Sequence, residues 1–308
     1  MVDDTIKGLN PQQANAVQTV GGPMLILAGA GSGKTKVLTC RIAHLLNQGV
    51  RPYRILAITF TNKAAAEMRE RVDKMAGEAA KDVWLHTFHA FCAKLLRIEI
   101  HNLGNYTNNF AIYDTTDTKS LMKQILQEMN LDEKRYQPSA VIGRISNAKN
   151  QLQTPEDYAK QASDFYDGKV AEIYARYEAK LQQNNALDFD DLLLLTLKLL
   201  QENEEVRSKY QDKFDYIMVD EYQDTNHAQY LLTKILAAKH KNICVVGDAD
   251  QSIYGWRGAD ITNILDFEKD YPEAKLVKLE QNYRSTQVIL DAATGVIIDN
   301  SVCSIKSA

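Results

Sequence analysis

The sequence predicts an α/β fold in which a parallel sheet carries helices on both faces and is interrupted by an inserted, all-helical subdomain. Four short apolar runs, each ending in a polar or glycine-rich turn, are typical of buried parallel strands. These runs are Met24–Ala28, Ile55–Phe60, Tyr216–Val219 and Ile243–Val246. A chain of 308 residues, 45% of them hydrophobic, is long enough for two domains. Because ligands bind beyond the carboxyl ends of such strands, the four following turns are expected to converge.

Between residues 106 and 185 the pattern becomes helical and poor in strands. Apolar and aromatic side chains recur there at helical spacing, which predicts helices that pack against one another. They form two stripes, namely Leu121, Ile125 and Met129, and then Ile173, Tyr177 and Leu181. The leucine-rich run from 192 to 200 predicts a further buried helix. We interpret these side chains as core packing and assign them no chemistry.

Composition excludes several classes of protein. No stretch approaches the roughly 18 consecutive uncharged apolar residues that a membrane span needs, and the acidic N-terminus lacks the order of a secretion signal. The sequence therefore predicts a cytoplasmic protein with no membrane role. A net charge of −4 excludes a globally basic nucleic-acid binder but leaves local basic patches open. The four cysteines form no CxxC pair, so we expect buried thiols rather than a zinc site or disulfides; they are Cys40, Cys92, Cys244 and Cys303.

The turn after the first apolar run has the features of a phosphate-binding loop. It reads Ala28-Gly29-Ala30-Gly31-Ser32-Gly33-Lys34-Thr35 and leads into a helical stretch, Val37–Leu46. Small residues let backbone N–H groups surround phosphates, and the helix N-terminus adds partial positive charge. In this Walker A pattern Lys34 is expected to reach the β- and γ-phosphates of ATP, and the Thr35 hydroxyl to bind Mg²⁺. Ala28 replaces the first glycine of the pattern, which is a sterically mild change.

Two adjacent carboxylates, Asp220 and Glu221, follow the third apolar run. Adjacent positions on a strand or turn point in different directions, so the two can take different roles. Asp220 is expected to hold Mg²⁺, directly or through water, and Glu221 to orient and deprotonate the water that attacks the γ-phosphate. Such a pair alone is more often a helix cap, so this prediction depends on the phosphate loop. Nearby polar side chains are interpreted as turn or capping residues; they are Asp188, Asp190, Asp191, Asp224 and Thr225.

Taken in order, seven segments of the chain resemble the motif series of the superfamily 1 DNA helicases of the PcrA, UvrD and Rep group. The segments are Leu9–Gln13, Gly29–Thr35, Thr59–Ala65, Thr87–Cys92, Asp220–Asn226, Val245–Asp260 and Glu280–Ser285. So many matches in one order leave little room for chance. The resemblance implies a RecA-like P-loop NTPase that uses ATP and Mg²⁺. It also implies an ATP-dependent helicase or translocase that moves 3′ to 5′ on single-stranded DNA in repair or replication.

The resemblance also implies roles for side chains around the nucleotide. Gln13 would hydrogen-bond the adenine, and Tyr283 would stack on it. Gln251 would sense the γ-phosphate, and Arg284 would reach that phosphate from the second motor half. The implied catalytic set is Glu221, Lys34, Gln251 and Arg284. The backbone of residues 28 to 35 would hold the phosphates.

Contacts with single-stranded DNA follow from the same resemblance. The implied set is Phe60, Asn62, His89, Phe189, Tyr254, Trp256 and Arg257. A base stacked on an aromatic ring gains about 1 to 3 kcal/mol whatever its identity, which suits movement along a strand. From the residues alone, core packing is favoured for Phe60 and Phe189. Trp256 lies between Gly255 and Arg257, a polar setting that favours a contact surface.

The resemblance divides the chain into a motor domain at 1–105 and 190–277 (1A), a helical subdomain at 106–189 (1B), and the beginning of a second motor domain at 278–308. In the family, the later motifs of the second motor domain follow the motifs found here, and they include another arginine that contacts the γ-phosphate. We therefore expect the chain to bind ATP and single-stranded DNA or its junctions with duplex, to hydrolyse ATP slowly and not to unwind duplex. Three alternatives remain open: a nucleotide-dependent DNA-binding module, an RNA-directed ATPase, and a subunit of a combined helicase and nuclease. No protein partner is indicated.

Overall fold

The computed structural model describes residues 4–248, 251 and 262–298. The chain forms two compact units, each assembled from separate stretches of sequence. Unit 1 comprises Met1–Thr87, Lys209–Asn226 and Thr233–Ala308, and unit 2 comprises Phe88–Ser208 and His227–Leu232. Helices α10 (Glu204–Lys213) and α11 (His227–Ala237) contribute residues to both units.

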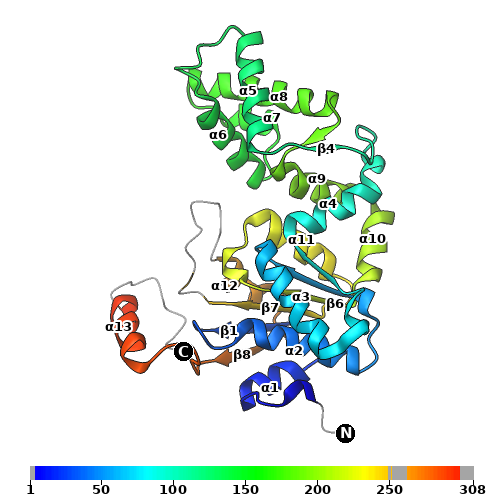
Figure 1. The fold of residues 1–308 in the computed structure, drawn as a ribbon. Coiled ribbons are helices and arrows are strands. Elements are labelled where there is room, and N and C mark those ends of the chain that lie inside the picture. Colours follow the sequence, from blue (N-terminus) through cyan, green and yellow to red (C-terminus); the bar gives the residue numbers. More distant parts are fainter. Residues whose placement is uncertain (1–3, 249–250, 252–261, 299–308) are drawn as a thin grey trace. The chain divides into compact units, whose positions relative to one another are not determined.

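Unit 1 is built on a six-stranded sheet in which every pairing is parallel (Figure 1). The strand order is β3-β2-β6-β7-β1-β8. The strands are β1 (Met24–Ala28), β2 (Ile55–Thr59), β3 (Trp84–Thr87), β6 (Tyr216–Val219), β7 (Ile243–Gly247) and β8 (Lys275–Leu279). This arrangement confirms the predicted α/β class and the four predicted strands. The two strands of this sheet that the sequence analysis missed, β3 and β8, are its edges, where a continuous apolar run is not required.

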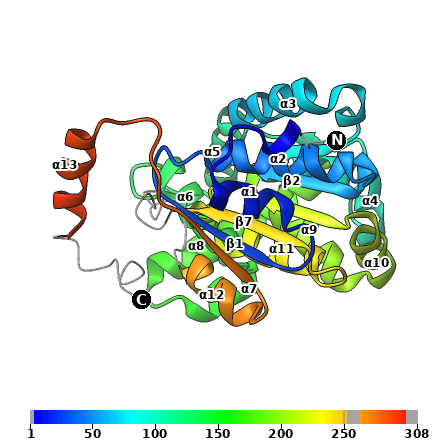
Figure 2. The same ribbon diagram turned by 90° about the horizontal axis from the view of Figure 1, so that it is seen from below.

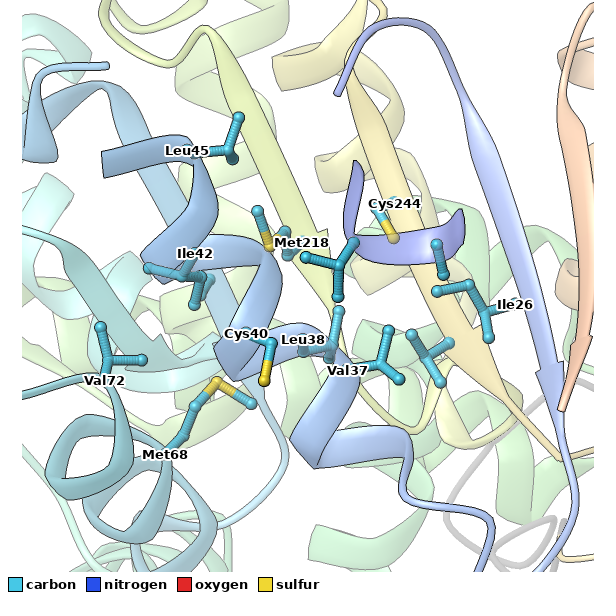
Figure 3. Close-up of a cluster of buried hydrophobic side chains, with 14 of the residues drawn as sticks. Ile26, Val37, Leu38, Cys40, Ile42, Leu45, Met68, Val72, Met218 and Cys244 are labelled. Atoms are coloured by element: carbon cyan, nitrogen blue, oxygen red, sulfur yellow. The ribbon is translucent and has the colours of Figure 1, made fainter. Parts of the chain in front are cut away.

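Helices cover both faces of this sheet, as predicted. One face carries α1 (Pro11–Gln18), α2 (Lys34–Asn47) and α3 (Asn62–Ala76), and Figure 2 shows α12 (Thr262–Asp270) on the opposite side. Figure 3 shows α2 at the centre of the first layer, between the strands and α3. The apolar side chains of α2 pack there against alternate residues of β1, β6 and β7 and against α3. After β8 the chain continues into α13 (Gln287–Ile298).

The core of unit 2 lies among helices (Figure 1). Those entirely within the unit are α4 (Phe88–Glu99), α5 (Thr115–Glu128), α6 (Pro138–Asn150), α7 (Pro155–Gln161), α8 (Phe165–Gln183) and α9 (Phe189–Glu202). The two predicted stripes meet in one core cluster, with Met129 partly buried against it, so their interpretation as core packing is confirmed. Two short strands that were not predicted, β4 (Ala111–Ile112) and β5 (Ala186–Leu187), form a parallel pair. The predicted buried helix at 192–200 lies within α9.

A buried ion-pair cluster fixes the beginning of α9. Asp188 caps the helix, and the carboxylates of Asp188 and Asp191 each accept the backbone N–H of the other residue, which confirms the predicted capping role of both residues. The Nζ atom of the fully buried Lys149 lies 2.6 Å from Asp191, 2.8 Å from Asp188 and 2.7 Å from Glu178. Burial opposes the charge on Lys149, but the carboxylates of Asp191, Asp188 and Glu178 outweigh it and hold the pKa of the ammonium well above its ordinary value.

Unit 1 also contains the short 3₁₀ helices η1 (Asp4–Ile6), η2 (Pro52–Arg54), η3 (Gly77–Ala80) and η5 (Tyr222–Asp224). In unit 2, η4 (Ile100–Leu103) follows α4. In the part of the chain that the structure describes, no helix combines the length and apolarity needed to cross a membrane. Cys40, Cys92 and Cys244 are buried free thiols, as predicted, whereas Cys303 lies outside the described residues. Burial raises the pKa of the Cys92 thiol to about 12.

Candidate nucleotide site

The glycine-rich loop joins β1 to α2 and has a backbone that requires glycine. Gly31 and Gly33 have φ angles of 68° and 88°, in the left-handed region that residues with a Cβ atom seldom adopt. Ser32 closes the turn, because its hydroxyl donates to the carbonyl oxygen of Gly29 at 2.7 Å. The N-cap of α2 is Gly33, which has no side chain that could accept a hydrogen bond from the helix. The first N–H groups of α2 are therefore not capped by a side chain and suit an anion.

Lys34 carries a buried positive charge at this loop. Its side chain belongs to the first turn of α2, and the residue is only 8% exposed. Its Nζ atom has no hydrogen-bond partner among the described residues, and it lies 3.4 Å from Oε2 of Glu221. A buried ammonium without hydrogen bonds is costly, so the loop is built for an anionic ligand that would accept them. A nucleotide polyphosphate fits this requirement.

The carboxylates after β6 lie against the loop. The hydroxyl of Thr35 donates to Oδ2 of Asp220 at 3.3 Å, so the two residues predicted to bind Mg²⁺ are in contact. Burial, and then the charge of Glu221, raise the pKa of Asp220 to about 6. Glu221 has a left-handed φ of 51°, and its carboxylate lies beside the ammonium of Lys34. A bound cation would stabilise the ionised form of Asp220.

A Mg²⁺ ion would need ligands from outside the protein at this position. Across the described ranges, no group of three or more His, Cys, Asp or Glu side chains could hold a metal ion by itself. Asp220 and Thr35 supply two oxygen atoms at one point. Phosphate oxygens and water would complete the shell, which is the usual manner in which Mg²⁺ binds with a nucleotide.

The sequence analysis missed Gln223, which is 1% exposed and lies in η5 (Tyr222–Asp224). Its Nε2 atom donates to Oε2 of Glu221 at 2.9 Å, and its Oε1 atom accepts the backbone N–H of Asp248 at 3.0 Å. Asp248 in turn accepts a hydrogen bond from Nε2 of Gln251 at 2.6 Å. The only sequence signal for Gln223 was its place inside the acidic segment after β6. The two nearby turn residues behave as predicted, since Asp224 belongs to η5 and the Thr225 hydroxyl bonds the carbonyl of Tyr222.

Gln13 is buried and its side chain is engaged within the protein. It forms a capping box with Asn10 at the start of α1, and its Nε2 atom donates to the carbonyl oxygen of Ser32 at 2.8 Å. Gln13 is thus attached to the glycine-rich loop. The predicted hydrogen bond to adenine would use the remaining N–H of the same amide.

The segment after β8 lies on the loop as well. The backbone N–H of Tyr283 donates to the carbonyl oxygen of Gly31 at 2.9 Å, and the Tyr283 hydroxyl accepts from the side chain of Asn10 at 2.9 Å. A Cβ atom at Gly31 would come within 2.7 Å of Cβ of Arg284. Asn282, which the sequence analysis did not single out, donates to the carbonyl oxygen of Ala30. The structure therefore brings both predicted residues of this segment to the phosphate loop.

In unit 1, two residues predicted to contact DNA follow β2. Phe60 is half-buried directly after the strand, so its side chain is not confined to the core. Asn62 is exposed and begins α3, which Thr61 caps by accepting the N–H of Ala64 at 3.0 Å. Three further predicted contacts lie outside the described residues; they are Tyr254, Trp256 and Arg257.

In unit 2, His89 and Phe189 are neighbours. Their ring centroids are 5.8 Å apart in an edge-to-face arrangement. Phe189 is 51% exposed, so the core packing favoured from the residues alone is wrong for this position. The reason is that Phe189 is the first residue of α9, next to its capping aspartate, and there the ring points to solvent rather than into the helix core. Burial lowers the pKa of His89, which keeps its imidazole neutral near pH 7.

Comparisons with known proteins agree with the motif series. Residues 9–272 match the UvrD/REP helicase N-terminal domain. The ATP-dependent DNA helicase PcrA of Staphylococcus epidermidis is 57% identical over 297 residues, which is 96% of this chain and 41% of that relative. The PcrA of Staphylococcus aureus is 57% identical over 294 residues, which is 95% of this chain and 40% of the relative. The chain thus spans about two fifths of the length of these relatives.

Proposed function

This chain belongs to the family of UvrD/REP helicase N-terminal domains, and on that premise we propose that it is the ATP-binding portion of a helicase that moves 3′ to 5′ on single-stranded DNA. The observation that carries the proposal is the buried ammonium of Lys34, which has no hydrogen-bond partner in the described part of the chain and lies beside Glu221. Thr35 and Asp220 meet at the same loop. The sheet that presents them is of the RecA-like P-loop type.

In this proposal Lys34 and the backbone of the glycine-rich loop bind the phosphates. When bound, ATP with Mg²⁺ supplies the scissile phosphoanhydride and the neutralising charge that hydrolysis needs. Thr35 and Asp220 hold the cation, and Glu221 accepts a proton from the attacking water. Gln251 and Arg284 contact the γ-phosphate, and Gln13 and Tyr283 contact the adenine. The contacts of Gln13, Tyr283 and Arg284 with the loop support the roles of these three residues, and the role of Gln251 follows from the resemblance to the family.

The DNA-facing surface in this proposal uses aromatic rings and polar side chains. Phe60 and Asn62 act in unit 1, and His89 and Phe189 act in unit 2. The exposure of Phe189 supports its role, because a stacking platform must be open to solvent when DNA is absent. Tyr254, Trp256 and Arg257 complete the set by resemblance to the family. The substrates are single-stranded DNA and its junctions with duplex.

The test is ATP turnover by this 308-residue chain, measured with and without single-stranded DNA. We expect nucleotide binding, slow hydrolysis and no unwinding, because the second γ-phosphate arginine of the family lies in the other motor half and such arginines accelerate related reactions roughly 10³- to 10⁵-fold. Strong stimulation by DNA would show that these residues are a self-sufficient motor. Binding without any turnover would instead mark them as a nucleotide-dependent DNA-binding module.

A competition between matched DNA and RNA strands separates the DNA helicase from an RNA-directed ATPase. Stacking platforms do not inspect the sugar, so the selectivity has to come from contacts with the backbone. We expect DNA to compete more strongly than RNA of the same sequence. Equal competition would contradict the assignment to DNA.

A further inference from the structure

The buried amide of Gln223 joins two parts of the nucleotide site that follow different strands. It follows Glu221 after β6, and it accepts a hydrogen bond from Asp248 at the end of β7. We propose that Gln223 is a positioning residue that aims the Glu221 carboxylate and ties it to the segment carrying Gln251. This inference rests on the proposed function, since it gives Glu221 and Gln251 their roles in ATP hydrolysis.

The two ends of the amide have different partners, and the chemistry allows only one orientation. The Nε2 donor faces the carboxylates of Glu221 at 2.9 Å and Asp224 at 3.4 Å. The Oε1 acceptor faces the N–H of Asp248 at 3.0 Å. A reversed amide would place an oxygen against two carboxylates and an NH₂ group against an N–H donor. The amide therefore holds the carboxylate of Glu221 by a hydrogen bond to a charged group, which is stronger than a neutral one.

Packing keeps this amide in place. Gln223 is 1% exposed, and the neighbouring position on β7 is Gly247. A Cβ atom at Gly247 would come within 2.9 Å of Oε1 of Gln223 and 2.7 Å of Cδ1 of Ile264. Glycine at 247 therefore leaves room for the Gln223 amide to lie against the sheet.

The path continues from β7 to the residue expected to sense the γ-phosphate. Gln251 donates from Nε2 to Asp248 at 2.6 Å, and its backbone N–H bonds the carbonyl oxygen of Asp248 at 3.0 Å. Hydrogen bonds therefore run without a gap from Glu221 through Gln223 and Asp248 to Gln251. A movement of Gln251 toward a phosphate would therefore change the position of the Glu221 carboxylate through this chain of hydrogen bonds.

Two substitutions of Gln223 test the contributions of the two ends of the amide separately. Gln223→Glu keeps the oxygen toward Asp248 but removes the donor and places a third carboxylate beside Glu221 and Asp224. Gln223→Met keeps the volume and removes the hydrogen bonds at both ends of the amide. Gln211→Met is the matched control, because Gln211 belongs to α10 and bonds only the carbonyl of Ile235 among the hydrogen bonds described for its side chain. Thermal melts establish that each variant is folded.

The first measurement is single-turnover ATP hydrolysis with the chain in excess, together with the dissociation constant of a fluorescent ATP analogue. Both Gln223 variants should slow hydrolysis about 10- to 100-fold, the size expected for losing a hydrogen bond to a charged group, while the dissociation constant stays within about threefold. Gln211→Met should change neither value. Weakened nucleotide binding in parallel with slower hydrolysis would mean a general structural role and would overturn the inference.

The second measurement needs no turnover. Hydrogen exchange of the Asp248 amide, followed by NMR in the nucleotide-free chain, should be faster by about 10-fold or more in Gln223→Met and nearly unchanged in Gln223→Glu. Equal exchange in the parent chain and both variants would overturn the inference, even for a chain that hydrolyses ATP very slowly.

Glu221→Gln, tested in the same assays, distinguishes a failure of the proposed function from a failure of the positioning role of Gln223. If this variant retains full turnover, the proposed base is wrong and the proposed function must be revised. If it loses turnover while both Gln223 variants keep theirs, the base assignment stands and only the positioning role fails.

Discussion

Thr35 and Asp220 are 185 positions apart in the sequence, yet the hydroxyl of Thr35 donates a hydrogen bond to the Asp220 carboxylate at 3.3 Å. The contact exists because β1 and β6 are parallel strands of one sheet, with only β7 between them. Their carboxyl ends therefore open at the same edge. The phosphate loop and the acidic segment form one site for this reason.

Replacing Lys34 by alanine should abolish detectable nucleotide binding. The buried ammonium lies at the loop without a hydrogen-bond partner among the described residues, so a phosphate would gain its full charge-assisted interaction. We expect a loss of at least about 100-fold in affinity, measured by titration with a fluorescent ATP analogue. Lys36→Ala is the control, because Lys36 is exposed and bonds the carbonyl of Gly8. Equal affinity of both variants would contradict the assignment of Lys34.

Replacing Phe189 by alanine should weaken binding of single-stranded DNA with little effect on folding. Loss of one stacked base corresponds to about 1 to 3 kcal/mol, or roughly 5- to 150-fold in affinity. Fluorescence anisotropy with a labelled oligonucleotide measures the change. Phe165→Ala is the matched control in the same unit, since Phe165 is 71% exposed at the first position of another helix. If the two variants bind DNA equally well, Phe189 is not a stacking platform.

Replacing Lys149 by methionine should destabilise unit 2 by about 3 to 5 kcal/mol, because it leaves buried carboxylates without their counter-charge. The affected groups are Glu178, Asp188 and Asp191. Urea unfolding followed by circular dichroism gives the free energy of unfolding. Lys123→Met, at an exposed position of α5, should change it by less than about 0.5 kcal/mol. A stable Lys149→Met chain would show that the three carboxylates accept protons without cost.

Acid should weaken the folded state through His89. Burial lowers its pKa below the ordinary value of 6.5, so the unfolded chain binds a proton in a pH range where the folded chain does not. Stability from this residue is therefore fully present above about pH 6.5 and is lost as the pH falls through the lowered folded pKa. Unfolding free energies between pH 5 and pH 7.5 should depend less on pH in His89→Gln than in the parent chain. Phe165→Ala, which removes an exposed side chain with no titratable group, should leave the slope unchanged.

Much of the site could be predicted because many of its residues lie in short continuous segments of the sequence. The loop from Ala28 to Thr35 is recognisable from its glycines followed by lysine and threonine, and Asp220 and Glu221 from the apolar strand before them. Backbone hydrogen bonding and side-chain alternation act over a few residues, so such patterns can be recognised in the sequence alone. The edge strands β3 and β8 were missed because they do not need the continuous apolar run of a strand buried on both sides.

The sequence by itself thus determined the class of fold, the loop for the phosphates and the acidic pair that follows β6. Only the tertiary structure decided which distant side chains complete them. Gln223 meets Asp248 across 25 positions, and Lys149 meets Asp188 across 39. No local periodicity encodes such pairs, since each depends on how separate elements pack. Burial then makes these hydrogen bonds and ion pairs obligatory, because a polar group removed from water without a partner is costly.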